Sequence, residues 1–332
     1  MTERVYPFLN LTLPENEYSN QEHGVRIELL EEAKKFENHH RDRSSKYSEG
    51  YYHTANVYID QPEEEAQQTA DALSQILSFA LWRDVIFNGK FPDSSADSTL
   101  LHINTAKFDI DNTHMPIIEG VATGLPDPGL ELGPFLDLAL EETVPASESE
   151  QKKKLRPIWF FLEASASVSA GIEFLLLWVA LESCANENYE SYKENVGDLF
   201  SETEREEIQS IVLEVAEERF SQDQVDFLEN RFGQDHLYEY GIDLKIKIFL
   251  EYLNIGFDME EIEEIIKESK RIRNLVVHQG ESDGLFNKNV NRLSELRKIL
   301  IFVIFRRLGV DRELQDRLVT PTFPGPNISE SN

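Results

Sequence analysis

Residues 258–280 read DMEEIEEIIKESKRIRNLVVHQG, and this stretch has the pattern of one amphipathic helix. Its apolar residues recur at the three- and four-residue spacing that places side chains on one helix face. They are Ile262, Ile265, Ile266, Ile272 and Val276. Asp258 followed by Glu261 is a capping pair for the start, and Gly280 suits the end. The spacing predicts a helix over 258–279 whose apolar stripe faces a core.

The helical character continues through the second half of the chain. Further helical patterns cover 168–187, 203–230, 243–254 and 288–308. Strand-like alternation disappears from this half, and no proline occurs between Pro157 and Pro321. We predict an all-helical domain over 158–312, packed as an up-and-down bundle. The tail over 313–332 is rich in Pro, Ser and Asn, which predicts disorder.

The first half alternates in type, so the fold class is predicted as α+β. HTANVYI (53–59) and STLLHINTAKFDID (98–111) read as strands, whereas residues 24–36 and 63–87 have helical spacing. We predict a mixed α/β domain over 1–150. The polar and charged stretch PASESEQKKKLRP (145–157) is the best candidate for a linker between the two domains.

Composition limits the class of protein. The 332 residues include 62 acidic and 32 basic side chains, a net charge of −30, which argues against a non-specific nucleic-acid binder. No run of about 18 apolar residues occurs, so no membrane span is expected. The single cysteine, Cys184, excludes an intramolecular disulfide framework and is interpreted as a small core residue. The N-terminus lacks the pattern of a secretory signal, and a cytoplasmic protein is the expectation.

The charge is unevenly distributed. Residues 267–307 carry ten basic and four acidic side chains, a net charge of +6, so the remainder carries −36. Arg273, Asn274 and His278 lie within this basic zone, in the last two turns of the predicted helix. Asn274 and His278 are four residues apart and share a face. Arg273 and His278 project about 140° apart, so they converge only if the helix end distorts or a second copy completes the site.

The segment RNLVVH, Arg273 to His278, resembles the Arg–polar–x–x–x–His signature of HEPN domains. The earlier helix FLLLWVALESC is similar to the Leu-Trp-x-x-Leu-Glu helix of the Apea-like HEPN branch, and the order of the two helices also fits. The resemblance covers about 160–312. It implies a small helical bundle with Arg273 and His278 as the catalytic pair and Asn274 as their polar companion. In members paired with a nucleotidyltransferase antitoxin, a tyrosine commonly follows the histidine by two residues. Gly280 occupies that position here, which puts control by tyrosine modification in doubt.

The resemblance also implies an activity. Many HEPN proteins are metal-independent endoribonucleases that act as dimers and leave a 2′,3′-cyclic phosphate and a 5′-hydroxyl. We therefore expect RNA as the substrate, no cofactor, no metal, and a homodimer through the C-terminal bundle, in anti-phage defence or a toxin-like stress response. Histidine suits such chemistry because it can donate or accept a proton near neutral pH. By analogy, residues 1–150 would sense, regulate or select the target, and a regulatory protein partner is compatible with this interpretation.

Glu182 is a supporting candidate. Phe174, Trp178 and Glu182 are successively four residues apart, so the carboxylate shares an apolar face and needs a partner if it is buried. Arg271 or Arg273 is the predicted partner. The alternative is a carboxylate that reaches solvent at the helix end. Asn274 could likewise cap the helix or face solvent, and the Arg/His pair could be a plain surface feature.

The sequence contains other candidate site residues and is compatible with other functions. His39, His40 and Asp42 are read as a solvated turn rather than a metal site, and Asp109 and Asp111 as an exposed strand face. No phosphate-binding glycine loop and no Cys/His zinc spacing occurs. The first alternative function is a non-catalytic HEPN module that binds nucleotide, RNA or a protein. A partner-binding scaffold that uses the acidic N-terminal half is the second.

Overall fold

The computed structural model of the chain describes residues 3–11, 13, 15–31, 53–81, 85–87, 131–167, 169–232, 234, 240–255, 257–279 and 283–311. These residues belong to two compact units. One unit comprises Met1–Ala180 together with Ile272–Asn332, and the other comprises Leu181–Arg271. Helices α5 (Ala170–Glu187) and α10 (Met259–Gln279) each continue from one unit into the other.

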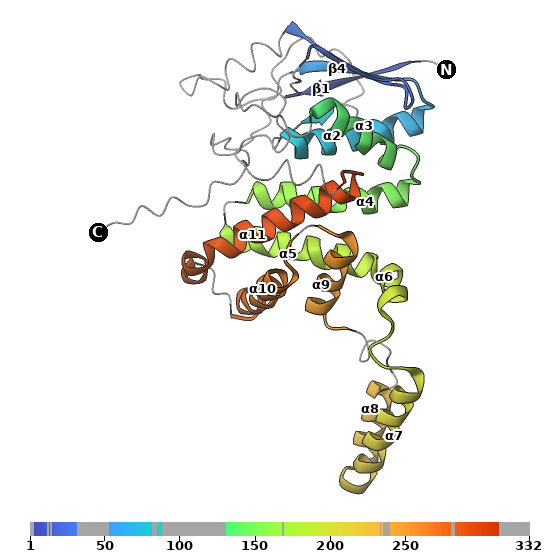
Figure 1. Cartoon of the computed structure of the whole chain (residues 1–332), viewed down its shortest axis with the longest axis vertical. Coiled ribbons are helices and arrows are strands. Elements are labelled where there is room, and N and C mark those ends of the chain that lie inside the picture. Colours follow the sequence, from blue (N-terminus) through green and yellow to red (C-terminus); the bar gives the residue numbers. More distant parts are fainter. Residues whose placement is uncertain are drawn as a thin grey trace, which may run out of the picture. The chain divides into compact units, whose positions relative to one another are not determined.

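The first unit contains a five-stranded antiparallel sheet, drawn in blue in Figure 1. Its strand order is β2-β3-β4-β1-β5. The strands are β1 (Arg4–Leu9), β2 (Glu17–Asn20), β3 (Val25–Leu29), β4 (His53–Ile59) and β5 (Ile86–Phe87). The central strand β4 has the bounds that its alternating sequence predicts. Val57 pairs with Tyr6 on one side and with Ile27 on the other.

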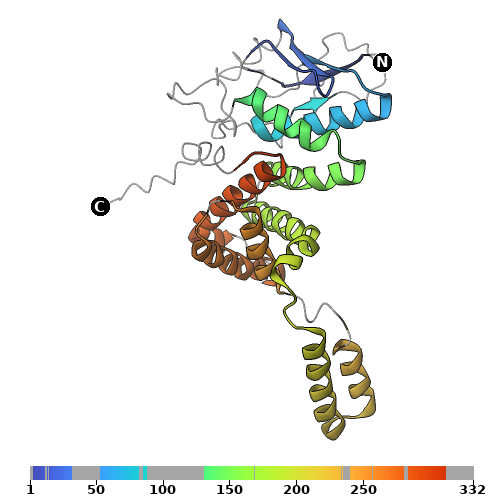
Figure 2. The same cartoon turned by 45° about the vertical axis from the view of Figure 1, so that its right-hand side comes forward.

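Two helices cover one face of this sheet. They are α2 (Glu63–Leu81) and α3 (Leu132–Thr143), which lie side by side in Figures 1 and 2. α2 begins with three glutamates, which suit the positive end of the helix dipole, and it buries eleven residues. The predicted helix over 63–87 is thus confirmed as far as Leu81, and the chain returns to the sheet as β5.

The core of the first unit also includes α4 (Glu148–Ser165) and α11 (Asp283–Arg307). Phe79 of α2 meets Phe161 of α4 and Phe305 of α11 edge to face, with ring centroids 5.4 and 5.5 Å apart. Phe135 of α3 meets Phe305 at 6.0 Å. All four rings are buried. The sequence suggests a domain boundary near 150–158. Phe79 and Phe135 precede this boundary, and Phe161 and Phe305 follow it.

The stretch interpreted as a linker, 145–157, is helical from Glu148 onward, so that interpretation is wrong. The physical reason is a capping box. The amide of Ser147 donates to the Glu150 carboxylate over 3.1 Å, and the Glu150 amide donates to Ser147 Oγ over 3.4 Å. Buried residues at Gln151 and Leu155 then fasten the helix to the core.

The helical prediction over 24–36 is also wrong for Val25–Leu29. Val25–Leu29 forms β3, which pairs with β2 and β4. Val25 and Ile27 are buried, and Arg26 between them is half-exposed, which is the two-residue period of a strand. The apolar spacing of so short a segment fits both a helix and a strand. Its pairing with β2 and β4 makes this segment a strand.

All regular elements described in the second unit are helices. Besides parts of α5 and α10, it contains α6 (Tyr189–Val196), α7 (Glu202–Arg219), α8 (Gln222–Phe232) and α9 (Ile242–Leu253). The single pattern over 203–230 is in fact two helices that turn at Phe220 and Ser221 and lie side by side in Figures 1 and 2. Ser221 starts the second helix, since its amide donates to Gln224 Oε1 over 3.1 Å.

The predicted fold class, α+β, is confirmed by these elements. The sheet lies in the N-terminal part, and every regular element described after residue 131 is a helix. The remaining helical patterns match α5, α9, α10 and α11 to within a few residues. Within the described ranges, no helix combines the length and the apolar composition that crossing a membrane requires. The predicted tail over 313–332 lies outside the described residues.

Candidate functional site

Helix α10 carries the predicted site residues and forms as its sequence indicates. Asp258 caps its start, because Asp258 Oδ1 accepts the amide of Glu260 over 2.8 Å. The four isoleucines of the predicted stripe are at most 2 % exposed, and Val276 is half-buried. Ser269 is buried on the same helix. The opposite face of α10 is therefore the one that meets solvent.

Two ion pairs join α10 to α9 within the second unit. Lys247 Nζ lies 2.6 Å from Glu263 Oε2, and Lys270 Nζ lies 2.7 Å from Asp243 Oδ1. Residue numbers rise along α9 as they fall along α10, so the two helices are antiparallel. The hydrogen bond from Lys247 lowers the pKa of Glu263 below its ordinary value. Burial alone would raise the pKa of Asp243, but the bonds from Lys270 and from nearby backbone amides lower it overall.

Arg273 and Asn274 form a contact on the last turns of α10. Arg273 is half-buried, and its Nη1 donates to Asn274 Oδ1 over 3.1 Å. Asn274 itself is exposed. An amide oxygen that accepts one of the five guanidinium N–H groups restricts the orientation of the guanidinium. Asn274 thus has a contact with the predicted catalytic arginine, and it is not simply a solvent-facing amide.

His278 is exposed one turn beyond Asn274. The backbone is α-helical from Arg273 to His278 and on to Gln279. Regular helix geometry places these two side chains about 140° apart around the axis and about 7.5 Å apart along it. The helix therefore does not distort at this position, so one of the two ways of bringing Arg273 and His278 together is removed. Gly280, the predicted C-cap, lies outside the described residues.

The two predicted supporting residues, Arg271 and Glu182, lie on α10 and α5 respectively. Arg271 is exposed, and its Nη2 lies 3.8 Å from Glu268 Oε1 on the same helix. Glu182 on α5 is half-buried, while Phe174 and Trp178 on the same face are buried, as their spacing predicts. An ion pair between Glu182 and an arginine stays a prediction.

A different carboxylate of α5 pairs with an arginine. Glu173 forms an ion pair with Arg297 of α11, and the two side chains are only 12 % and 19 % exposed. Sequence reasoning missed this pair, although Glu173 is one of only two acids in the most apolar stretch of the chain, 171–185. A charged residue inside such a stretch needs a partner, and that requirement was the available signal.

The basic zone over 267–307 is partly neutralised by such pairs. At least four of its ten basic side chains lie close to a carboxylate. The pairs are Lys270 with Asp243, Arg271 with Glu268, Arg292 with Glu295, and Arg297 with Glu173. The net charge of +6 already counts Glu268 and Glu295, but Asp243 and Glu173 lie outside 267–307 and offset two further positive charges.

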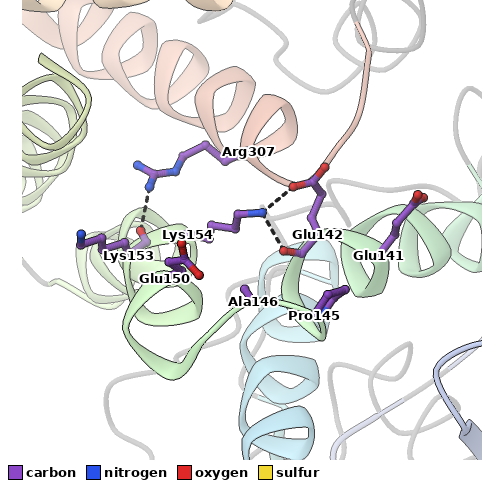
Figure 3. Close-up of a pocket in the computed structure, with 8 residues that line it drawn as sticks. All are labelled: Glu141, Glu142, Pro145, Ala146, Glu150, Lys153, Lys154 and Arg307. Carbon is purple, nitrogen blue, oxygen red and sulfur yellow. Dashed lines mark hydrogen bonds and ion pairs between the residues drawn. The ribbon is translucent and has the colours of Figure 1, made fainter. Parts of the chain in front are cut away.

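A hollow of about 370 Å³ in the first unit is a second candidate (Figure 3). Its lining residues are Glu141, Glu142, Pro145, Ala146, Glu150, Lys153, Lys154 and Arg307. Lys154 Nζ donates to the Glu142 carboxylate over 2.5 Å and to the Glu142 carbonyl over 2.7 Å. Arg307 Nη2 donates to the Lys153 carbonyl over 3.0 Å, as the dashed line in Figure 3 marks. The lining contains three basic and three acidic residues, so the hollow has no net charge that would select a charged ligand.

The remaining sequence candidates divide into two groups. Cys184 is a buried core residue, as predicted. His39, His40, Asp42, Asp109 and Asp111 lie outside the described residues. Among the side chains that are described, no three His, Cys, Asp or Glu residues gather into a group that could hold a metal ion.

Comparisons with known proteins add nothing to these observations. No family model, curated protein or solved structure matches the chain. The functional interpretation therefore depends on the geometry of α10 and on the sequence signature that this helix carries.

Proposed function

We propose that the protein is a metal-independent endoribonuclease of the HEPN type, with Arg273, Asn274 and His278 as its reacting and orienting residues. The observation that carries the proposal is the end of α10. There an exposed imidazole and an arginine held by an asparagine occupy the last two turns of an otherwise well-packed helix. We place the activity in the cytoplasm, in anti-phage defence or a toxin-like stress response.

The chemistry needs three groups. A neutral His278 takes the proton of the ribose 2′-hydroxyl, and the 2′-oxygen attacks the adjacent phosphorus. Arg273 stabilises the charge that builds on the phosphorane oxygens. The bond from phosphorus to the 5′-oxygen breaks, and a protonated second His278 gives its proton to that leaving oxygen. The products are a 2′,3′-cyclic phosphate and a 5′-hydroxyl.

A homodimer supplies the second histidine in this proposal. Arg273 and His278 of one copy diverge along a regular helix, so a single copy cannot direct both at one phosphate. A two-fold axis near the C-terminal part of α10 would bring two copies of each side chain into one groove. Val277, which is 50 % exposed between the two motif residues, is an apolar contact that such an interface could bury.

The test uses the purified full-length chain with total RNA and tRNA in excess chelator. The comparison set is wild type, Arg273→Ala and His278→Ala. The matched controls are Arg219→Ala, an exposed arginine at the end of α7, and His23→Ala, in the turn between β2 and β3. We expect cleavage by wild type and both controls, and a loss of about 10²–10⁴-fold in the two motif variants.

Other results would replace the proposal. RNA binding without turnover would favour the non-catalytic module. Cleavage that stops on addition of chelator would favour a metal-dependent enzyme. Indifference to RNA and to His278 would favour the scaffold.

A further inference from the structure

The hairpin formed by α7 and α8 has almost no core of its own. Ala216 is the buried residue of α7, and Val225 is the buried residue of α8. A helix as short as the 11-residue α8 is marginal in water unless it packs against something. Large apolar side chains on the hairpin instead face solvent, including Ile211 at 54 % exposure and Val215 at 44 %.

Ile211 and Val215 form one apolar flank. They are four residues apart on α7, so they lie one above the other. By helix geometry Val215 points about 100° away from Ala216, which is the side that packs on α8. The flank is therefore beside the contact with α8 and available to a third helix.

A row of exposed carboxylates borders this flank. Glu207, Glu214 and Glu218 lie seven and four residues apart on α7 and are all exposed. Helix geometry places Glu214 and Glu218 about 60° from Ile211 and Val215 respectively. An apolar stripe edged by charge is the arrangement by which packed helices select a partner of opposite charge.

The charge of the hairpin limits the class of partner that can bind the flank. Residues 202–232 contain ten acidic and three basic side chains, a net charge of −7. A second copy of the hairpin, a nucleic acid and an anionic lipid surface would each be repelled. A cationic protein surface would be attracted.

We propose that the flank of Ile211 and Val215 is a docking surface for a basic amphipathic helix of a partner protein. The apolar side chains of that helix pack on Ile211 and Val215. Its Lys or Arg side chains pair with Glu207, Glu214 and Glu218. The inference does not depend on the proposed nuclease activity.

The test is binding of a labelled synthetic peptide to the full-length chain, measured by fluorescence anisotropy. The peptide is about three heptads long, with Leu at a and d and Lys at e and g. A peptide of scrambled order and one with Glu in place of Lys are the peptide controls. We expect the Lys peptide to bind wild type and the control peptides not to bind.

Matched variants localise the interaction. Ile211→Ser with Val215→Ser should abolish binding. Glu214→Gln with Glu218→Gln should weaken binding about fivefold, as expected for two exposed ion pairs. Glu206→Gln with Glu217→Gln removes the same charge from exposed positions on the other side of α7 and should leave the affinity unchanged. Glu214→Lys with Glu218→Lys should transfer binding from the Lys peptide to the Glu peptide. This charge reversal still tests the docking surface if Ile211→Ser with Val215→Ser fails to fold.

Three results would overturn the proposal. One is the absence of binding by the Lys peptide. Another is equal weakening by the two glutamine pairs, because that would indicate diffuse acidity. The third is self-association of wild type that Ile211→Ser with Val215→Ser abolishes, because the occupant would then be a second copy of the chain.

Discussion

Arg273 and His278 leave α10 about 140° apart, because they lie five positions apart on an uninterrupted α-helix. Asn274 instead lies beside both, in hydrogen-bond contact with Arg273 and one turn before His278. A single copy of the helix thus presents the two proposed catalytic groups in different directions, and the proposed activity requires a second copy.

A mixing experiment tests this requirement. An equal amount of His278→Ala protein, allowed to exchange with a fixed amount of wild type, should reduce the cleavage rate to about half. Random pairing then places half of the wild-type protomers opposite an inactive copy. The rate is measured at constant wild-type concentration, and an equal amount of His23→Ala protein, which stays active, is the control that should double the rate. An unchanged rate would show that each copy acts alone.

Replacing Asn274 by Ala should lower the cleavage rate by about tenfold and leave the melting temperature unchanged. The side-chain amide orients the guanidinium of Arg273, and a hydrogen bond to a charged group contributes on the order of 1.4 kcal/mol. Asn274 is exposed, so its removal leaves no buried gap. Rates and thermal melts of Asn274→Ala and Arg273→Ala are compared. If Asn274→Ala cleaves at the wild-type rate, the orienting role is wrong.

Replacing Glu173 by Gln should destabilise the fold. Its partner Arg297 is mostly buried, and an arginine without its counter-charge in that position costs about 1–2 kcal/mol. The melting temperature should fall by roughly 3–6 °C. The double variant Glu173→Gln with Arg297→Met should lose less than the sum of the two single variants, because neither charge is then left uncompensated. Simple additivity would argue that the pair does not form.

Replacing Glu182 by Gln distinguishes three roles for this half-buried carboxylate. If Glu182 orients an arginine, as we predict, the cleavage rate falls and the melting temperature drops slightly. Loss of all activity at an unchanged melting temperature would make Glu182 the general base. No change in either quantity would make it a solvated carboxylate. Glu163→Gln, at an exposed position on α4, is the control.

The ion pair between Asp243 and Lys270 should stabilise the protein at neutral pH but not in acid. The pKa of Asp243 is lowered from its ordinary value of 3.8, so the stabilisation is present above that value. It is lost as the pH falls through the lower pKa of the folded state. Wild type should therefore melt above Lys270→Met by roughly 1–3 °C at pH 7, as for a partly exposed pair of about 0.2–1 kcal/mol.

That difference in melting temperature should shrink below pH 3.8. Lys267→Met, on the exposed face of the same helix, is the control and should track wild type more closely. A difference that is constant from pH 7 to pH 3 would show that the stabilisation does not come from the Asp243 carboxylate.

The sequence predicts the elements whose period is unambiguous. HTANVYI alternates over a full strand, and the stripe of α10 repeats over several turns, so each has only one fitting structure. The sequence predictions are wrong where the local pattern fits more than one structure. Residues 24–36 fit two periods, and pairing with neighbouring strands, which sequence spacing does not show, makes Val25–Leu29 a strand.

Two other wrong predictions, the linker over 145–157 and the single helix over 203–230, could have been corrected from the sequence. Ser147 with Glu150 and Ser221 with Gln224 are both capping pairs, and each marks a helix start inside a stretch interpreted otherwise. At the site, the sequence locates the motif on the end of α10. It does not find the ion pair of Glu173 with Arg297, because partners 124 positions apart meet only through the fold.

The central claim is that Arg273 and His278 cleave RNA through attack by the ribose 2′-oxygen without a metal. The most direct measurement maps the cleavage site in excess chelator and then repeats the reaction on RNA that has a single 2′-deoxynucleotide at that site. We predict 2′,3′-cyclic phosphate and 5′-hydroxyl ends from wild type, a loss of about 10²–10⁴-fold in the cleavage rate of His278→Ala, and no cleavage of the 2′-deoxy substrate. Cleavage of the 2′-deoxy substrate, or undiminished cleavage by His278→Ala, would contradict the account.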